Sequence, residues 1–259
     1  MSENEFDFEE ETKAKKFQPR WFLPVLAKPK KTMAEIATAE HAIWLAPLLA
    51  LMVTALILVL VSAPILGKAA LSATPPDWLP YYGEETQQQY QDAVKMSASP
   101  VTTVLFPLLG KFLGIWVGWI LLGSIFHMAL TLNGSRTPNL TALNIVSWSS
   151  VPFIFRDLVQ IVAILVTKQL ILKPGLSGFF ADGATGFAAF LAAMFAFIDL
   201  YLIWQFVLMG LAAMNISGIK SGKAWLAVLI AVIVFLVIKA LPKLLMAQFS
   251  GLSTGGFYF

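Results

Sequence analysis

The sequence predicts an all-α, polytopic membrane protein with about five transmembrane helices and an N-terminal amphipathic helix at the membrane interface. Of its residues, 58% are hydrophobic and only 13% are charged, whereas average soluble domains carry about 25% charged residues. The mean hydropathy is +0.75. The apolar stretches are continuous rather than alternating, which is typical of membrane-spanning helices.

The N-terminal region divides into two predicted parts. Residues 1–20 are acidic and then basic, and they carry too few apolar residues to bury a core, so we predict a disordered cytosolic tail. Residues 21–41 place Met33 and Ile36 at helical spacing, with Lys30 on the opposite side. This pattern predicts an amphipathic segment that either lies on the membrane or packs against other protein.

The membrane domain is expected over residues 42–247. A short outer tail follows at 248–259, and a Pro- and aromatic-rich outer loop occupies 67–100, with a short surface helix in its polar part. The first turns of the apolar stretch that begins at residue 101 are expected to lie flat. Five apolar stretches are long enough to cross a bilayer, at residues 42–66, 108–131, 141–167, 186–214 and 224–246.

Loop charge predicts the orientation. With the N-terminus inside, the inner segments hold the N-terminal basic cluster together with Arg136, Lys220 and Lys223. Positive residues favour the cytoplasmic side, so we expect a cytoplasmic N-terminus and an outer C-terminus. Lys239 and Lys243, near the end of the last span, are expected to extend outward to the interface.

The inventory of chemical motifs argues against an enzyme. The sequence contains no HExxH, GxSxG, P-loop or GxGxxG motif. It has no cysteine, and its two histidines, His41 and His127, lie on different segments. We therefore predict no catalytic, metal or cofactor site. The net charge of +3 comes mostly from loops and indicates no nucleic-acid partner.

Three charged residues are expected at mid-membrane depth, namely Arg156, Asp157 and Asp199. Each costs about 2.5–3.5 kcal/mol at a helix centre, so they require partners. We predict an ion pair between Arg156 and Asp199, with Gln160 one turn along on the same face. Asp157 points about 100° away and needs another partner, a water-filled cavity or a proton. The cluster is either a structural clamp or a pathway for protons or substrate.

Two further features of the predicted spans are structural. Gly110, Gly114 and Gly118 recur every four residues, which places them on one helix face where a neighbouring backbone can approach. That face packs either inside the monomer or against a second chain. Pro152 interrupts the third span and is either a hinge or a fixed bend, with nearby serine hydroxyls available to the freed carbonyl groups.

Three segments resemble the Yip domain family of membrane proteins. Residues 28–33 read Lys-Pro-Lys-Lys-Thr-Met, and residues 147–152 read Ser-Trp-Ser-Ser-Val-Pro. Residues 199–224 begin with Asp, an aromatic residue and Trp, and end with Gly, a turn and Lys-Ala. The resemblance covers about residues 25–245. The chain is more similar to the bacterial-type branch of the family, because its N-terminal region contains no Asp-Leu-x-Gly-Pro segment of the eukaryotic type.

The resemblance implies five spans, a cytosolic N-terminus, a bacterial plasma membrane and no enzymatic activity, and it brings no defined binding residues. Eukaryotic relatives are linked to small GTPases and vesicle traffic, whereas some bacterial-type relatives accompany ABC-type exporters. We therefore expect an accessory or scaffold protein whose partners are the lipid bilayer, another membrane complex or a second copy. The alternative is a small transporter or an ion or proton channel that uses Arg156, Asp157 and Asp199.

Overall fold

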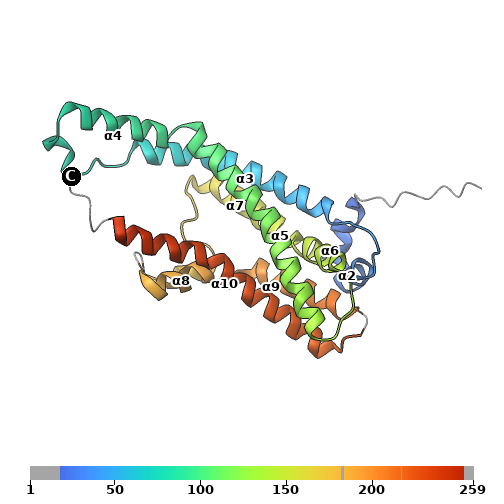
Figure 1. Cartoon of the computed structure of the whole chain (residues 1–259). Coiled ribbons are helices and arrows are strands. Elements are labelled where there is room, and N and C mark those ends of the chain that lie inside the picture. Colours follow the sequence, from blue (N-terminus) through green and yellow to red (C-terminus); the bar gives the residue numbers. More distant parts are fainter. Residues whose placement is uncertain (1–17, 182–183, 217, 254–259) are drawn as a thin grey trace, which may run out of the picture.

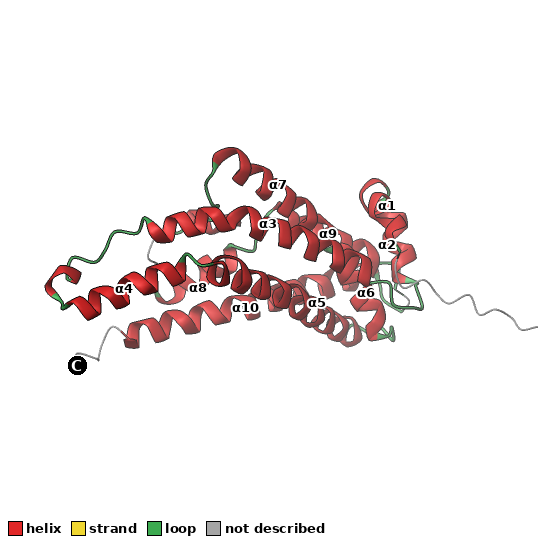
Figure 2. Ribbon diagram, turned by 90° about the horizontal axis from the view of Figure 1, so that it is seen from above, coloured by secondary structure: helices red, strands yellow, loops and turns green. Residues whose placement is uncertain are grey.

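The computed structural model describes residues 18–181, 184–216 and 218–253. All regular secondary structure within these residues is helical, which confirms the all-α class (Figures 1 and 2). Most of the predicted tail, residues 1–17, lies outside the described residues. The helices run lengthwise in an elongated bundle, with α2 (Pro29–Ala37) at one end and α4 (Glu84–Ser97) at the other (Figure 1).

Four long helical stretches are apolar enough to cross a membrane. They are α3 (Leu45–Leu71), the helix Val101–Leu132, the helix Asn139–Thr167 and residues Ser221–Pro242 of α10 (Ser221–Ser253). A fifth crossing results if α8 (Gly186–Phe195) and α9 (Leu200–Ala213) count as one span. The protein is therefore an integral, multi-pass membrane protein.

The predicted fourth span differs most from the sequence prediction, because α8 and α9 meet at 65°. The backbone at Asp199 is extended, and its carboxylate oxygen Oδ1 accepts a hydrogen bond from the amide of Leu202 at 2.8 Å. The short 3-10 turn η4 (Gly175–Phe179) approaches the break, where the amide of Leu176 donates to the carbonyl of Ile198 at 3.1 Å. A backbone group that the break exposes thus has a partner, as the membrane interior requires.

The other boundaries follow the prediction with smaller differences. A π-helical turn, Val101–Leu105, continues directly into α5 (Phe106–Leu132), so the first turns of this span do not lie flat. The polar part of the loop over residues 67–100 forms the exposed helix α4, as expected. The last helix reaches Ser253 and thus extends into the segment predicted as a tail.

The third span consists of α6 (Asn139–Ser149) and α7 (Val151–Thr167), which still form one stretch of 29 residues. Pro152 lies in the first turn of α7, where the missing N–H removes no intrahelical hydrogen bond. Ser150 stands at the junction, and its hydroxyl donates to the carbonyl of Val146 at 2.7 Å. The proline therefore occupies a short break rather than a sharp turn.

The N-terminal amphipathic segment packs against protein. It forms α1 (Phe22–Ala27) and α2, and α2 contacts α6 and α9. Val25, Met33 and Ile36 are completely buried. Of the two alternatives open at the sequence level, the structure favours burial against other helices, because the apolar side of α2 is already covered by the chain itself.

Polar side chains of α6 fix the non-helical backbone that leads into α3. The amide of Ile43 donates to Asn144 Oδ1 at 3.0 Å, and Asn144 Nδ2 donates to the carbonyl of His41 at 2.9 Å. Trp148 Nε1 donates to the carbonyl of Ile43 at 3.0 Å. These buried bonds satisfy backbone groups that would otherwise be costly to bury.

Candidate functional site

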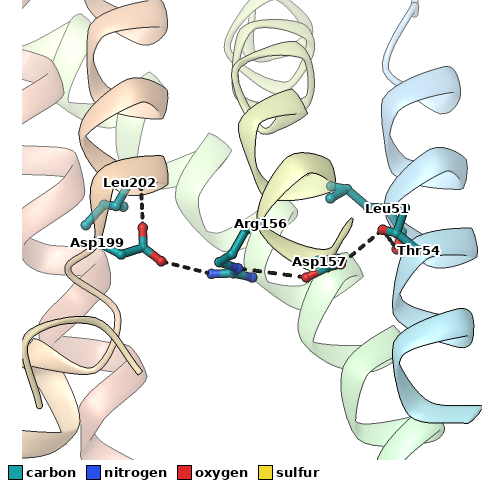
Figure 3. A network of polar contacts seen from close by, with 6 residues as sticks. All are labelled: Leu51, Thr54, Arg156, Asp157, Asp199 and Leu202. Carbon is teal, nitrogen blue, oxygen red and sulfur yellow. Dashed lines mark hydrogen bonds and ion pairs between the residues drawn. The ribbon is translucent and has the colours of Figure 1, made fainter. Parts of the chain in front are cut away.

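A chain of polar contacts crosses the middle of the bundle and links α9, α7 and α3 (Figure 3). Arg156 Nη1 lies 3.7 Å from Asp199 Oδ2, and Arg156 Nε lies 3.8 Å from Asp157 Oδ1. On the far side, the hydroxyl of Thr54 donates to Asp157 Oδ2 at 3.0 Å. The structure therefore brings together the three charged residues that the sequence singled out.

Asp199 is not in the middle of a helix, as the sequence suggested, but caps the first turn of α9. One carboxylate oxygen accepts from the Leu202 amide and the other faces Arg156 (Figure 3). Aspartate is among the best residues at this capping position. The side chain therefore has two roles, since it begins a helix and contributes a charge.

Thr54 is the partner that Asp157 lacked in the sequence analysis. Asp157 is only 5% exposed, and its carboxylate lies between Thr54 on α3 and Arg156 on its own helix. A single threonine in an apolar span does not indicate in the sequence that it will contact Asp157, because that contact depends on how α3 packs against α7. Thr54 could not have been identified without the fold.

Arg156 has unused bonding capacity. Its two ion pairs, at 3.7 and 3.8 Å, are longer than the 2.7–3.2 Å typical of a hydrogen bond. The Nε atom is buried and has no hydrogen-bond partner among the described residues. The guanidinium carbon lies 4.5 Å from the centre of the Phe153 ring, which stabilises the cation without using its N–H groups.

Arg156 and Asp157 also line a cavity of about 350 Å³ among α3, α5, α6, α7, α9 and α10. Its ionisable lining consists of Lys111, Arg156, Asp157 and Lys239. Gln205 also lines it and donates from Nε2 to Ser150 Oγ at 3.0 Å. The other walls are apolar and include Leu51, Ala55, Ile115, Phe235 and Leu236. Gln160, predicted to join the cluster, does not line the cavity.

Lys239 is exposed but lies beside two aromatic rings. Its ammonium nitrogen is 4.2 Å from the centre of the Phe197 ring and 5.4 Å from that of Phe235. Such cation–π contacts stabilise an ammonium group away from water. Lys239 therefore belongs to the cavity. The side chain of Lys243 lies outside the described residues.

A family model described as the Yip1 domain matches residues 23–241. The chain belongs to the Yip1 domain family. The resemblance inferred from the three sequence segments is therefore confirmed. The match spans the described helices from α1 to the apolar part of α10. No curated protein and no solved structure matches the chain.

The segments that carried the resemblance hold this Yip1 domain together. Trp148 of the Ser-Trp-Ser-Ser-Val-Pro segment anchors the backbone before α3, and Asp199 begins α9. In the same segment as Asp199, Gly210 faces the indole of Trp225 on α10, and a methyl group added at Gly210 would overlap that ring. The residues of these segments thus anchor backbone, begin a helix and allow two helices to pack closely.

The three regularly spaced glycines of α5 have unequal surroundings. A methyl group added at Gly118 would contact Phe235 Cζ at 3.6 Å, whereas one added at Gly110 or Gly114 would meet nothing within 4 Å. Gly114 and Gly118 line the cavity, and Gly110 does not. Within the described residues, neither Gly110 nor Gly114 is therefore a site of close helix packing.

Among the described residues, no group of three His, Cys, Asp or Glu side chains is placed to hold a metal ion. The arrangement offers charge and hydrogen bonding in a partly apolar cavity. Its chemistry suits the binding of an ionic group or the fixing of helices against one another.

Proposed function

We propose that this Yip1 domain protein is a non-enzymatic accessory or scaffold protein that assists another membrane complex, such as an ABC-type exporter. The observation that carries the proposal is the open side of α5. Only 6% of the apolar window of Val101–Leu132 is buried inside the chain, against 33% or 44% in the other three long spans. The buried residues of α5 all lie in its second half, from Trp119 to Leu130, so the first half is little covered by its own chain and is available to another one.

The composition of this side suits helix association. Leu109, Leu113 and Val117 are about half exposed or more, and Gly110 lies beside them with open space around its Cα. Small residues at four-residue spacing let helix backbones approach closely in a membrane, where packing replaces the hydrophobic effect. The partner would place a helix against Gly110 and the adjacent apolar ridge.

The test is affinity purification of the tagged full chain from its native membrane in mild detergent, followed by mass spectrometry. We expect a membrane complex in stoichiometric amount, and we expect its recovery to fall when Gly110 is replaced by Leu. The matched control is Gly222→Leu at the start of α10, where an added methyl group also meets nothing within 4 Å. Recovery of the chain alone, as a monomer or homo-oligomer, would contradict an accessory role.

A second candidate, a small transporter or ion channel, is favoured by the cavity beside Asp157. Mid-membrane ionisable residues next to a cavity often mark a path for ions or substrates. Against it, Asp157 is buried and engaged by Thr54 and Arg156. Flux of protons or small ions in liposomes tests this candidate, with Asp157→Asn and Asp199→Asn as variants. Transport that both variants abolish would support it over a scaffold.

A further inference from the structure

The central cavity holds more positive than negative charge. Three cations line it, Lys111, Arg156 and Lys239, against the single carboxylate of Asp157. The two carboxylates nearest to Arg156, those of Asp157 and Asp199, both form ion pairs with it. No carboxylate of the described residues forms an ion pair with Lys111 or Lys239. Unpaired cations inside a membrane protein are costly, so a bound anion would offset this cost.

The cavity opens sideways, between two helices. Lys111 and Gly114 on α5 and Lys239 on α10 are exposed, whereas Leu51 and Asp157, on the opposite wall, are buried. The cavity therefore ends against α3 and α7 and opens between α5 and α10. Because these helices belong to membrane spans, the opening faces lipid rather than water.

The cations also lie toward one membrane surface. Lys111 is in the first half of the Val101–Leu132 helix, and Lys239 is in the second half of α10 (Ser221–Ser253). The start of α5 and the end of α10 are at the same end of the bundle, the end that carries α4 (Figure 1). Both lysines therefore lie on the α4 side of the midpoints of their helices, toward the membrane surface at that end.

We propose that this cavity binds the phosphate group of an anionic membrane phospholipid, which enters between α5 and α10. Lys111 and Lys239 contact the phosphate as point charges, and Arg156 supplies N–H donors. Guanidinium and ammonium groups are the side chains that recognise phosphate in proteins. The buried Nε of Arg156, which has no partner among the described residues, is one donor available for this contact.

The remaining walls suit the rest of a lipid molecule. Ile115 on α5 and Phe235 and Leu236 on α10 present apolar surface beside the cations. The volume of about 350 Å³ lies within the range of roughly 300–1,000 Å³ found for small-molecule sites. It is enough for a headgroup and the first part of an acyl chain, while the remaining chain lies in the surrounding bilayer. The inference is independent of any protein partner.

The test measures lipid bound to the full chain in mild detergent by native mass spectrometry. The probes are phosphatidylglycerol, phosphatidylcholine and inorganic phosphate, each added in a titration. We expect saturable binding of one phosphatidylglycerol. Phosphatidylcholine has the same phosphate but adds a choline ammonium, which the three cations of the cavity repel, so we expect it to bind at least about tenfold more weakly.

Two variants and a matched control test the position of the site. Lys111→Gln combined with Lys239→Gln removes two cations, and Gly114→Leu fills the cavity at a position where an added methyl group meets nothing within 4 Å. Gly110→Leu introduces the same side chain one turn earlier on the same helix, outside the cavity lining. We expect the first two variants to weaken phosphatidylglycerol binding about tenfold or more, and Gly110→Leu to bind as the unmodified chain does.

Three results would overturn the proposal. Equal binding of phosphatidylglycerol and phosphatidylcholine would remove the role of the cations. Unchanged phosphatidylglycerol binding in both the lysine variant and Gly114→Leu would place the lipid elsewhere on the surface. Saturable binding of inorganic phosphate that the lysine variant abolishes, without retention of phosphatidylglycerol, would assign the site to free phosphate. Because Gly110→Leu is expected to lose a protein partner but keep the lipid, failure of the accessory role and failure of the lipid site give different results.

Discussion

The two roles of Asp199 can be separated by two substitutions. Asp199→Asn keeps a side-chain oxygen that can accept from the Leu202 amide at the start of α9, but it removes the charge that faces Arg156. Asp199→Ala removes both. Comparing the two variants therefore measures the capping hydrogen bond apart from the ion pair.

The expected magnitudes follow from the geometry. The ion pair is long, at 3.7 Å, and its side chains are 32% and 18% exposed. Removing one partner of a buried ion pair costs about 3–5 kcal/mol. Because this pair is long and Arg156 keeps Asp157 as a second partner, Asp199→Asn should lower the free energy of unfolding by less, about 1–3 kcal/mol. Asparagine is as good a capping residue as aspartate, whereas replacing either by alanine costs about 0.5–2 kcal/mol. Asp199→Ala should therefore cost about 1 kcal/mol more than Asp199→Asn.

The assay is reversible unfolding in mixed micelles with increasing sodium dodecyl sulfate, followed by tryptophan fluorescence or far-ultraviolet circular dichroism. Equal destabilisation by Asp199→Asn and Asp199→Ala would refute the capping role and leave the charge as the only contribution. A charge exchange between positions 156 and 199 would not isolate the ion pair. An arginine at position 199 cannot accept the Leu202 amide, so the exchange would lose the cap even if the pair formed.

Three other predictions concern packing and buried hydrogen bonds. Gly210→Leu should destabilise the fold by about 1–3 kcal/mol through overlap with Trp225, and adding Trp225→Ala should recover part of this loss in the same unfolding assay; no recovery would place the strain elsewhere. Thr54→Val should cost about 1–3 kcal/mol because Asp157 loses its hydroxyl donor, whereas Thr54→Ser should be close to neutral, and equal losses would show that the methyl group matters instead. Asn144→Leu should release the backbone before α3, detected as faster amide hydrogen exchange at residues 41–43; unchanged exchange there would contradict the anchoring role.

The spans were predictable because hydropathy alone determines which stretches cross a bilayer. The uninterrupted apolar residues of α3 and α10 leave no other placement. The break before Asp199 was not predicted, since hydropathy averages over a window and does not register a short non-helical segment. The signal was present nevertheless, because an aspartate inside an apolar stretch is better placed as a helix cap than within a helix.

The candidate site was only partly predictable. The free-energy cost of an unpaired charge inside the membrane was enough to predict the ion pair between Arg156 and Asp199. It could not identify Lys239 as a member, because the direction of a lysine near a helix end depends on which rings lie beside it, here Phe197 and Phe235. The cavity itself is formed by residues of six packed helices, so no single segment of the sequence could have predicted it.

The junction between α8 and α9 divides one apparent span into two parts with different neighbours. Helix α8 packs on α10 and on η4, whereas α9 packs on α2, α6, α7 and α10. Only one residue of α8, Ala193, is buried, against seven in α9. Cooperative unfolding units follow such differences in packing. Amide hydrogen exchange should therefore proceed in two phases, with α8 opening first while α9 stays closed with the remainder of the bundle.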